Sequence, residues 1–157
     1  MPPNRTRKQG PSPMTRLINS LGLALVKNYE GLRLEPYKCP AGIWTVGYGH
    51  TKGVTEHTHC TPEMAEAWLE SDLMHAEEEV TRLVKVPLND NQYSALVSFT
   101  FNVGAGNLQT STLLKKLNEG GYDLVPAYIK AWVFAAGKQQ PGLVKRRAAE
   151  AALWSLK

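Results

Sequence analysis

Three residues in the first third of the chain have types and a spacing that could support acid–base chemistry. Glu30 stands at the predicted end of an apolar helix, and Cys39 and Thr45 follow it along a short stretch of alternating residues. A glutamate near a helix C-terminus faces the negative end of the helix dipole, and burial adds a desolvation penalty, so both effects favour its protonated form. A protonated carboxyl group is the form that a general acid needs.

The arrangement of these residues in space decides between chemistry and ordinary structure. If the stretch after the helix folds back on the helix end, Cys39 and Thr45 would face Glu30 across a gap that fits one sugar bond and one water. Hydrolysis of a glycosidic bond requires such a gap. Taken singly, the three residues have simpler interpretations: a solvated glutamate, a buried cysteine in a turn and a strand threonine.

The helix that carries Glu30 is predicted to begin at Ser20 and to end at Gly31. Ser20 can act as the N-cap, and Gly31 suits the left-handed residue that often terminates a helix. Between them, apolar side chains follow helical spacing: Leu21, Leu25, Val26 and Tyr29.

Residues 34 to about 55 are predicted to form the short strands of a small antiparallel sheet. Alternation places Trp44, Val46 and Tyr48 on one face. On the opposite face, Thr45 is expected to be exposed among glycines, where a ligand can approach closely.

The remainder of the chain is predicted to be helical. Thr61 caps a long helix that has Pro62 in its first turn. Asn89 opens a second helix, with Gln92 in capping-box spacing. Shorter helices are expected from Ser111, from Asp123 and from about Leu143. The predicted fold class is α+β, with a small three-stranded antiparallel sheet near the N-terminus that a long helix joins to a mostly helical lobe.

The length and composition describe one ordinary globular domain. With 157 residues, of which 43% are hydrophobic and 20% charged, the chain can bury a core without a stabilising disulfide. Residues 1–13 are rich in proline and carry basic side chains, so we expect a disordered basic extension, followed by a single domain over residues 14–157. The net charge of +4 and the isoelectric point near 9.1 favour an anionic partner.

The spacing of Glu30, Cys39 and Thr45, followed by Gly-Tyr-Gly-His at residues 47–50, resembles the phage-type lysozymes, the bacteriophage endolysins of glycoside hydrolase family 24. Their signature is Glu, eight residues, Asp or Cys, five residues, Thr, and this chain matches it. Further segments resemble the helical lobe of the same family: Phe-Asn-Val-Gly at 101–104, Ser-Thr-Leu-Leu at 111–114, and Pro-Gly-Leu at 141–143 before Arg146 and Arg147. The resemblance covers roughly residues 20 to 155.

The resemblance implies a lysozyme-like fold with a cleft between two lobes. The sheet lobe would span about residues 30–60, and the helical lobe about residues 61–157 together with the helix 20–30. In that cleft, a lysozyme of this family would hydrolyse the β-1,4 bond between N-acetylmuramic acid and N-acetylglucosamine in peptidoglycan, which lyses the host cell. The glycan strands are the expected partner, and we expect no cofactor and no metal.

The resemblance also implies roles for individual residues. Glu30 would be the proton donor, and Cys39 and Thr45 would hold the attacking water. Four further residues would line the cleft and touch sugar or stem peptide: Thr51, Phe101, Thr112 and Tyr128.

Residues around this set are expected to support it. His50 would anchor the hairpin, with Asp72 as its partner. Arg146 or Arg147 would reach Glu30 and steady its charge, the alternative being a solvated basic face. We expect Glu35 to be exposed and to have no catalytic role.

Cys39 departs from the carboxylate that many relatives have. An unperturbed thiol has a pKa of about 8.5 and is mostly neutral at pH 7, so it is a poor base unless a cation or a dipole lowers that value. Three roles stay open: a thiolate that positions water, a neutral group while Thr45 does most of the orienting, or a nucleophile that gives retained stereochemistry. We favour the first two roles, which keep inversion.

The histidines and cysteines offer two alternative interpretations. One is the zinc site of an amidase, although the spacing of the ligands fits no common pattern: His50, His57, His59, Cys60 and Cys39. The other is a disulfide between the two cysteines that blocks the site after export.

Two other functions compete with hydrolysis by a lysozyme. A lytic transglycosylase breaks the same bond without water, and it would need Glu30 but neither Cys39 nor Thr45. A non-catalytic module that binds the cell wall would use the basic tail. The chain has no helix-turn-helix or aromatic-studded strand signature, so we expect no nucleic acid as a partner.

We expect a monomer that is made in the host cytoplasm. The sequence has no secretory signal pattern and no apolar run near the roughly 18 residues of a membrane span, so stable membrane insertion is not expected. The enzyme would act on the wall in the periplasm after holin-type release. Its basic surface would make electrostatic contact with anionic outer-membrane polymers.

Overall fold

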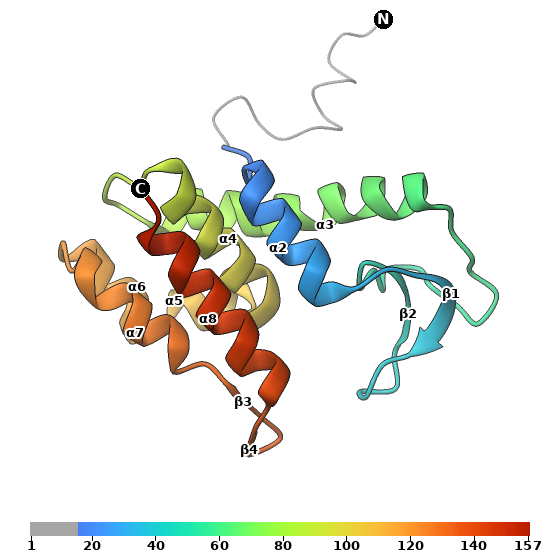
Figure 1. Cartoon of the computed structure of the whole chain (residues 1–157). Helices are drawn as coiled ribbons and strands as arrows, with labels where there is room; N and C mark the ends of the chain where they lie inside the picture. The colour runs from blue at the N-terminus through green and yellow to red at the C-terminus, as the bar shows by residue number, and fades with distance from the viewer. Residues whose placement is uncertain (1–15) are drawn as a thin grey trace, which may run out of the picture.

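The computed structural model describes residues 16–157 and combines α-helices with a small antiparallel sheet, which confirms the α+β class (Figure 1). The predicted extension at residues 1–13 lies outside the described residues. The helices are α2 (Ser20–Glu30), α3 (Pro62–Leu83), α4 (Asp90–Val103), α5 (Ala105–Gln109), α6 (Thr112–Asn118), the 3-10 helix η1 (Tyr122–Leu124), α7 (Val125–Lys130) and α8 (Pro141–Ser155). The strands are β1 (Arg33–Lys38), β2 (Trp44–Gly47), β3 (Phe134–Ala135) and β4 (Lys138–Gln139). Within residues 16–157, no helix is both long and apolar enough to cross a membrane.

Side-chain caps set the starts of α3, α4 and α6. The predicted caps Thr61 and Asn89 are confirmed, and Ser111, from which a helix was expected, caps α6; each side chain accepts a backbone N–H from the first turn of its helix. Gln92 completes the predicted capping box with Asn89. The helix expected from about Leu143 is α8, which begins two residues earlier.

The predicted cap of α2 is wrong by one residue. Asn19 caps the helix, because its side chain accepts the N–H of Gly22 at 2.9 Å, and Ser20 becomes the first helical residue. The backbone N–H of Asn19 also donates to the Ser94 hydroxyl on α4 at 2.9 Å. This tertiary contact fixes Asn19 at the cap position.

The N-terminal sheet has two strands within the described residues, so the predicted number of three is wrong. β1 and β2 pair antiparallel. After β2 the chain turns at Gly47 and Gly49, whose φ angles are 68° and 78°. Glycine adopts such angles without strain. The tight turn leaves a single bridge between Val46 and His50 in place of a third strand.

Helix α3 connects two hydrophobic clusters of the structure. The larger cluster lies among the helices and includes Leu69 of α3. The smaller cluster lies under the sheet and consists of Val46, Cys60 and Ala65. Because Ala65 and Leu69 stand one turn apart on the same helix, α3 sets the position of the sheet relative to the helices (Figure 1).

A buried carboxylate fixes the segment that leads into α2. Glu77 of α3 is 3% exposed and accepts the backbone N–H of Ile18 at 2.7 Å. From α4, the Tyr93 hydroxyl donates to the carbonyl of Arg16 at 2.8 Å. Burial raises the pKa of Glu77, while the hydrogen bond from Ile18 opposes this shift.

We predict that Glu77→Gln increases the free energy of unfolding at neutral pH and loses this advantage in acid. An acid whose pKa is raised by folding binds more protons in the folded state, so its contribution to stability falls as pH rises from the ordinary glutamate range through the raised value. Glutamine is uncharged, and its oxygen can still accept the Ile18 N–H. Urea unfolding at about pH 4 and about pH 7 measures the difference. A wild type and a variant with the same pH dependence would contradict the prediction.

Candidate active site

Glu30 is the last residue of α2 and forms an ion pair with α8. Its side chain is 20% exposed, and its Oε2 accepts a hydrogen bond from Arg146 Nη1 at 2.8 Å. The predicted contact with Glu30 is therefore made by Arg146, while Arg147 points to the carbonyl of Trp132. The guanidinium fixes one carboxylate oxygen in place and leaves Oε1 for other contacts.

The second oxygen of Glu30 lies beside Gly49. A Cβ atom at position 49 would stand 2.6 Å from Oε1, so a side chain there would force the Glu30 carboxylate to move. The φ angle of Gly49, 78°, also favours glycine. The hairpin therefore approaches the acid with bare backbone.

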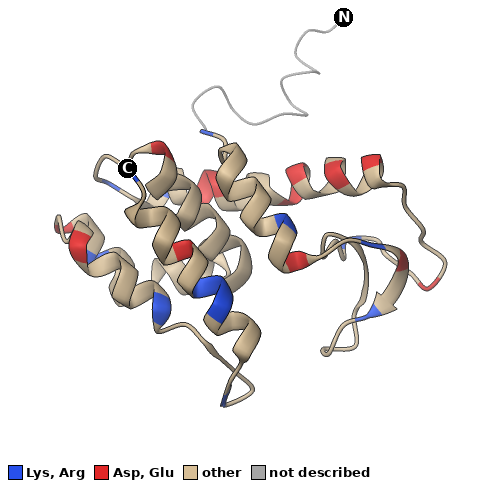
Figure 2. Cartoon of the chain, in the orientation of Figure 1, with Lys and Arg blue, Asp and Glu red and all other residues tan. Residues whose placement is uncertain are grey.

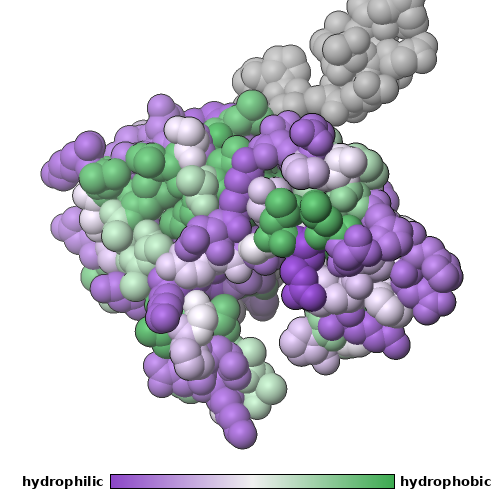
Figure 3. Space-filling model, turned by 45° about the vertical axis from the view of Figure 1, so that its right-hand side comes forward, coloured by the Kyte–Doolittle hydropathy of each residue, from purple (hydrophilic) through white to green (hydrophobic). Residues whose placement is uncertain are grey.

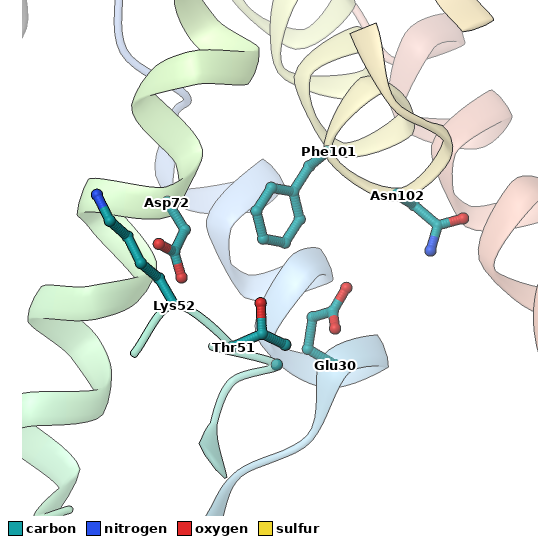
Figure 4. A pocket seen from close by; sticks show the side chains of 7 residues that line it. Glu30, Thr51, Lys52, Asp72, Phe101 and Asn102 are labelled. Atoms are coloured by element: carbon teal, nitrogen blue, oxygen red, sulfur yellow. The ribbon is translucent and has the colours of Figure 1, made fainter. Parts of the chain in front are cut away.

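Two cavities meet at Glu30. The smaller, of about 380 Å³, lies toward α3 (Figure 4), and the larger, of about 560 Å³, lies toward the β3–β4 hairpin. Glu30 and Asn102 line both cavities, so the acid stands where they join. The space-filling view shows an open notch between the sheet and this hairpin (Figure 3). An extended ligand can therefore pass Glu30 with a part on each side.

Two of the four predicted substrate-binding residues line the smaller cavity. Thr51 and Phe101 face it from the hairpin side and from α4 (Figure 4). Thr112, exposed at the start of α6, and Tyr128, packed against the larger hydrophobic cluster, line neither cavity. Asn102 lines both cavities and is not among the predicted site residues, although it lies inside the Phe-Asn-Val-Gly segment that resembles the family.

Cys39 and Thr45 flank the turn between β1 and β2. The N–H of Cys39 donates to the carbonyl of Ile43 at 3.0 Å, and the Thr45 hydroxyl donates to the same carbonyl at 2.9 Å. Thr45 is 4% exposed, so the expectation of an exposed hydroxyl is wrong: the side chain turns inward to hold the turn. Cys39 is partly exposed. Neither residue lines the two cavities beside Glu30, but Pro40 lines the larger one.

The two thiols have opposite surroundings. Backbone hydrogen bonds from Ile43 and then from Ala41 lower the pKa of the Cys39 thiol, and the Thr45 hydroxyl adds a smaller effect in the same direction. Burial raises the pKa of Cys60, which lies in the smaller hydrophobic cluster. Both thiols are free, so the hypothetical disulfide between them is not formed in this structure.

The histidines near the hairpin pair with separate carboxylates. His50 Nδ1 lies 2.8 Å from Asp72 Oδ2, and its ring stacks on Trp68 with 4.5 Å between centroids, so the predicted partner of His50 is confirmed. His59 lies beside Glu35, which is exposed as predicted. Within residues 16–157, no three His, Cys, Asp or Glu side chains are grouped so as to hold a metal ion.

A buried network of charges lies behind Glu30. Arg146 and Arg147 are 3% and 1% exposed, so the alternative of a solvated basic face is wrong. Glu150, one turn later on α8 and 0% exposed, forms ion pairs with both. Figure 2 shows that α8 carries both basic and acidic residues. Burial lowers the pKa of Arg147, and the negative charge of Glu150 opposes this shift.

Known proteins are similar to this chain in both sequence and fold. The model of the phage lysozyme family matches residues 27–150. The endolysin of Acyrthosiphon pisum secondary endosymbiont phage 1 is 48% identical over 141 residues, which are 87% of this chain and 97% of that protein. The muramidase domain of SpmX from Asticaccaulis excentricus superposes with a TM-score of 0.85 at 36% identity, over 90% of this chain and 99% of that one. A P22 lysozyme mutant superposes with a TM-score of 0.80 at 37% identity, over 88% of this chain and 98% of that one. The chain therefore belongs to the phage lysozyme family, and it is a glycoside hydrolase.

Proposed function

We propose that the chain is a muramidase that hydrolyses the β-1,4 bond between N-acetylmuramic acid and N-acetylglucosamine in peptidoglycan, and that Glu30 is the proton donor. The observation that carries the proposal is the position of Glu30 at the junction of two cavities. A glycan strand that passes this junction has a sugar on each side of the acid, as cleavage within a polymer requires.

The contacts of Glu30 suit proton transfer to a glycosidic oxygen. Oε1 lies on the side of the bare Gly49 backbone, while Arg146 holds Oε2. As the proton leaves, negative charge develops on the carboxylate, and the neighbouring guanidinium stabilises that charge. The ion pair thus favours the transition state as well as the orientation of the acid.

In this proposal Cys39 holds the attacking water, and Thr45 holds the turn that carries Cys39. Thr45 stabilises the turn through the carbonyl of Ile43, and the turn lowers the pKa of the Cys39 thiol, which increases its thiolate fraction. A thiolate accepts a hydrogen bond from water and can orient it. Attack by this water on the face opposite the departing sugar gives inversion.

We propose that the glycan strand contacts residues in the smaller cavity beside Glu30 and residues farther away. Thr51 and Phe101 would contact sugar in the smaller cavity, where Phe101 offers an apolar face and Thr51 a hydroxyl. Thr112 and Tyr128, on α6 and α7, would contact sugar or stem peptide farther from Glu30.

We propose a monomer without cofactor or nucleic-acid partner, which reaches the wall in the periplasm after holin-type release. The net charge of +4 would attract it to anionic polymers of the outer membrane.

Glu30→Gln is expected to reduce kcat by about 10²- to 10⁴-fold, because glutamine cannot donate a proton to the leaving oxygen. The matched control is Glu35→Gln, since Glu35 is exposed and lines neither cavity. Mass spectrometry of fragments released from purified peptidoglycan should show reducing muramic ends for the wild type and the control. Anhydro ends from the wild type would instead identify a lytic transglycosylase, and full activity of Glu30→Gln would remove Glu30 from the mechanism.

Replacement of Cys39 tests the proposed water site. Cys39→Ser should lower kcat by about tenfold or more, because an uncharged hydroxyl orients water less strongly than a thiolate, whereas Cys39→Asp should keep most activity. Cys60→Ala is the control for loss of a thiol. Steady-state kinetics on peptidoglycan measure these rates, and an unchanged rate for Cys39→Ser would leave the thiol without a catalytic role.

Alkylation separates the two cysteines by their surroundings. The pKa of Cys39 is lowered and that of Cys60 is raised, so Cys39 should react with iodoacetamide faster and at lower pH. Peptide mass spectrometry of the native protein over a pH series gives both profiles. If Cys39 reacted only at the pH at which a free cysteine peptide reacts, or at higher pH, the result would contradict the proposed thiolate.

A further inference from the structure

We infer that Glu150 is a positioning residue, which orients the acid Glu30 and the cleft amide Asn102 through two arginines. The inference rests on the proposed role of Glu30. Glu150 is fully buried on α8 and does not line the cavities beside Glu30. It can therefore act on the reaction only through other residues.

The two oxygens of Glu150 hold different guanidiniums. Oε2 accepts Arg146 Nε at 3.1 Å and the Ser98 hydroxyl at 2.6 Å. Oε1 accepts Arg147 Nη1. One carboxylate on α8 is thus shared between two adjacent arginines of the same helix.

The first arginine, Arg146, links Glu150 to the acid Glu30. Arg146 donates from Nε to Glu150, from Nη2 to the carbonyl of Ser98 at 3.2 Å, and from Nη1 to Glu30 at 2.8 Å. A planar guanidinium that is bound on all three nitrogens has no freedom to rotate. The direction of the contact with Glu30 is therefore set by Glu150 and Ser98.

The second arginine, Arg147, links Glu150 to the lining of the cleft. Arg147 donates from Nη2 to Asn102 Oδ1 and from Nε to the carbonyl of Trp132 at 2.9 Å. Asn102 lines both cavities beside Glu30. Because Arg147 holds its oxygen, the amide NH₂ group of Asn102 is the part free to meet a ligand.

The charges of the network also act on the acid. Glu30 faces Arg146 from α8, and Lys52 and Asp72 stand across the smaller cavity. Within residues 16–157, the charged side chains that contact Glu150 are Arg146 and Arg147, and α4 contributes the uncharged hydroxyl of Ser98. Removal of the Glu150 charge leaves excess positive charge behind Glu30, which stabilises its carboxylate over the protonated acid.

The test compares Glu150→Gln with Glu77→Gln, a substitution of a second buried glutamate that has no contact with the network. Activity is expressed per folded molecule, with the folded fraction taken from thermal melts. We expect Glu150→Gln to lower kcat by about tenfold or more with KM changed by less than about threefold, since misplacement of a reacting group acts on the transition state. The alkaline limb of the kcat profile, which a general acid sets, should move to lower pH.

Ser98→Ala tests the same network with a milder change. It removes the hydroxyl between Arg146 and Glu150, so kcat should fall in the same direction by about threefold. Glu77→Gln should match the wild type in kcat, KM and pH profile.

Two outcomes would overturn the role of Glu150, and a third would overturn the proposed function on which it rests. Unchanged kcat and an unmoved alkaline limb in folded Glu150→Gln would overturn the inference. If Glu150→Gln does not fold, a Ser98→Ala enzyme that matches Glu77→Gln would overturn it equally. Glu30→Gln, measured in parallel, separates the two levels: full activity there would overturn the proposed function itself.

Discussion

The ion pair between Arg146 and Glu30 is the contact on which the site depends. It joins residues that stand 116 positions apart and ties the end of α2 to α8. Without it, Glu30 would be a carboxylate at a helix end with no fixed direction. With it, one oxygen is bound and the other is directed toward Gly49, so the acid has one orientation at the junction of the two cavities.

The hairpin must then be held at the correct distance from this fixed acid. The backbone at Gly49 can approach Oε1 only because it carries no side chain. His50, the next residue, bonds to Asp72 and stacks on Trp68, both on α3. Since α3 also contributes to the larger cluster, the hairpin and the helices share one rigid support. Geometry at the acid is thus a property of α2, α3 and α8 together.

The sequence predicted those features whose causes are local. Caps at Thr61 and Asn89 depend on side chains within one turn of the helix start, so spacing alone identifies them. At α2, both Asn19 and Ser20 are good caps, and the choice is made by Ser94 of a distant helix. The third strand was wrongly predicted because the alternating pattern does not show the positive φ angles at Gly47 and Gly49.

In the candidate site, too, the sequence predicts local features and misses those that depend on distant contacts. The spacing of Glu30, Cys39 and Thr45 matches a family signature, so the sequence alone identifies them as candidates. The inward direction of Thr45 depends on the carbonyl of Ile43, and no residue pattern specifies that contact. The burial of Arg146 depends on Glu30 and Ser98, from two other helices, so a basic pair near the C-terminus looks in the sequence like a solvated face.

The energetics of this buried network favour a role in positioning over a role in stability. Moving charges from water into a protein interior costs several kcal/mol per ion, and apolar residues of similar volume are often as stable or more stable than a buried ion pair. Arg146, Arg147 and Glu150 are nearly inaccessible, so they bear that cost in full. What an apolar substitute would lack is direction: a carboxylate and two guanidiniums fix the angles of their partners, because each of these groups makes several directional hydrogen bonds at once. The partners at the two ends of the network are Glu30 and Asn102, the residues that line both cavities. The cost of burial is therefore offset where the proposed function needs orientation, at the acid and the amide that would meet the substrate.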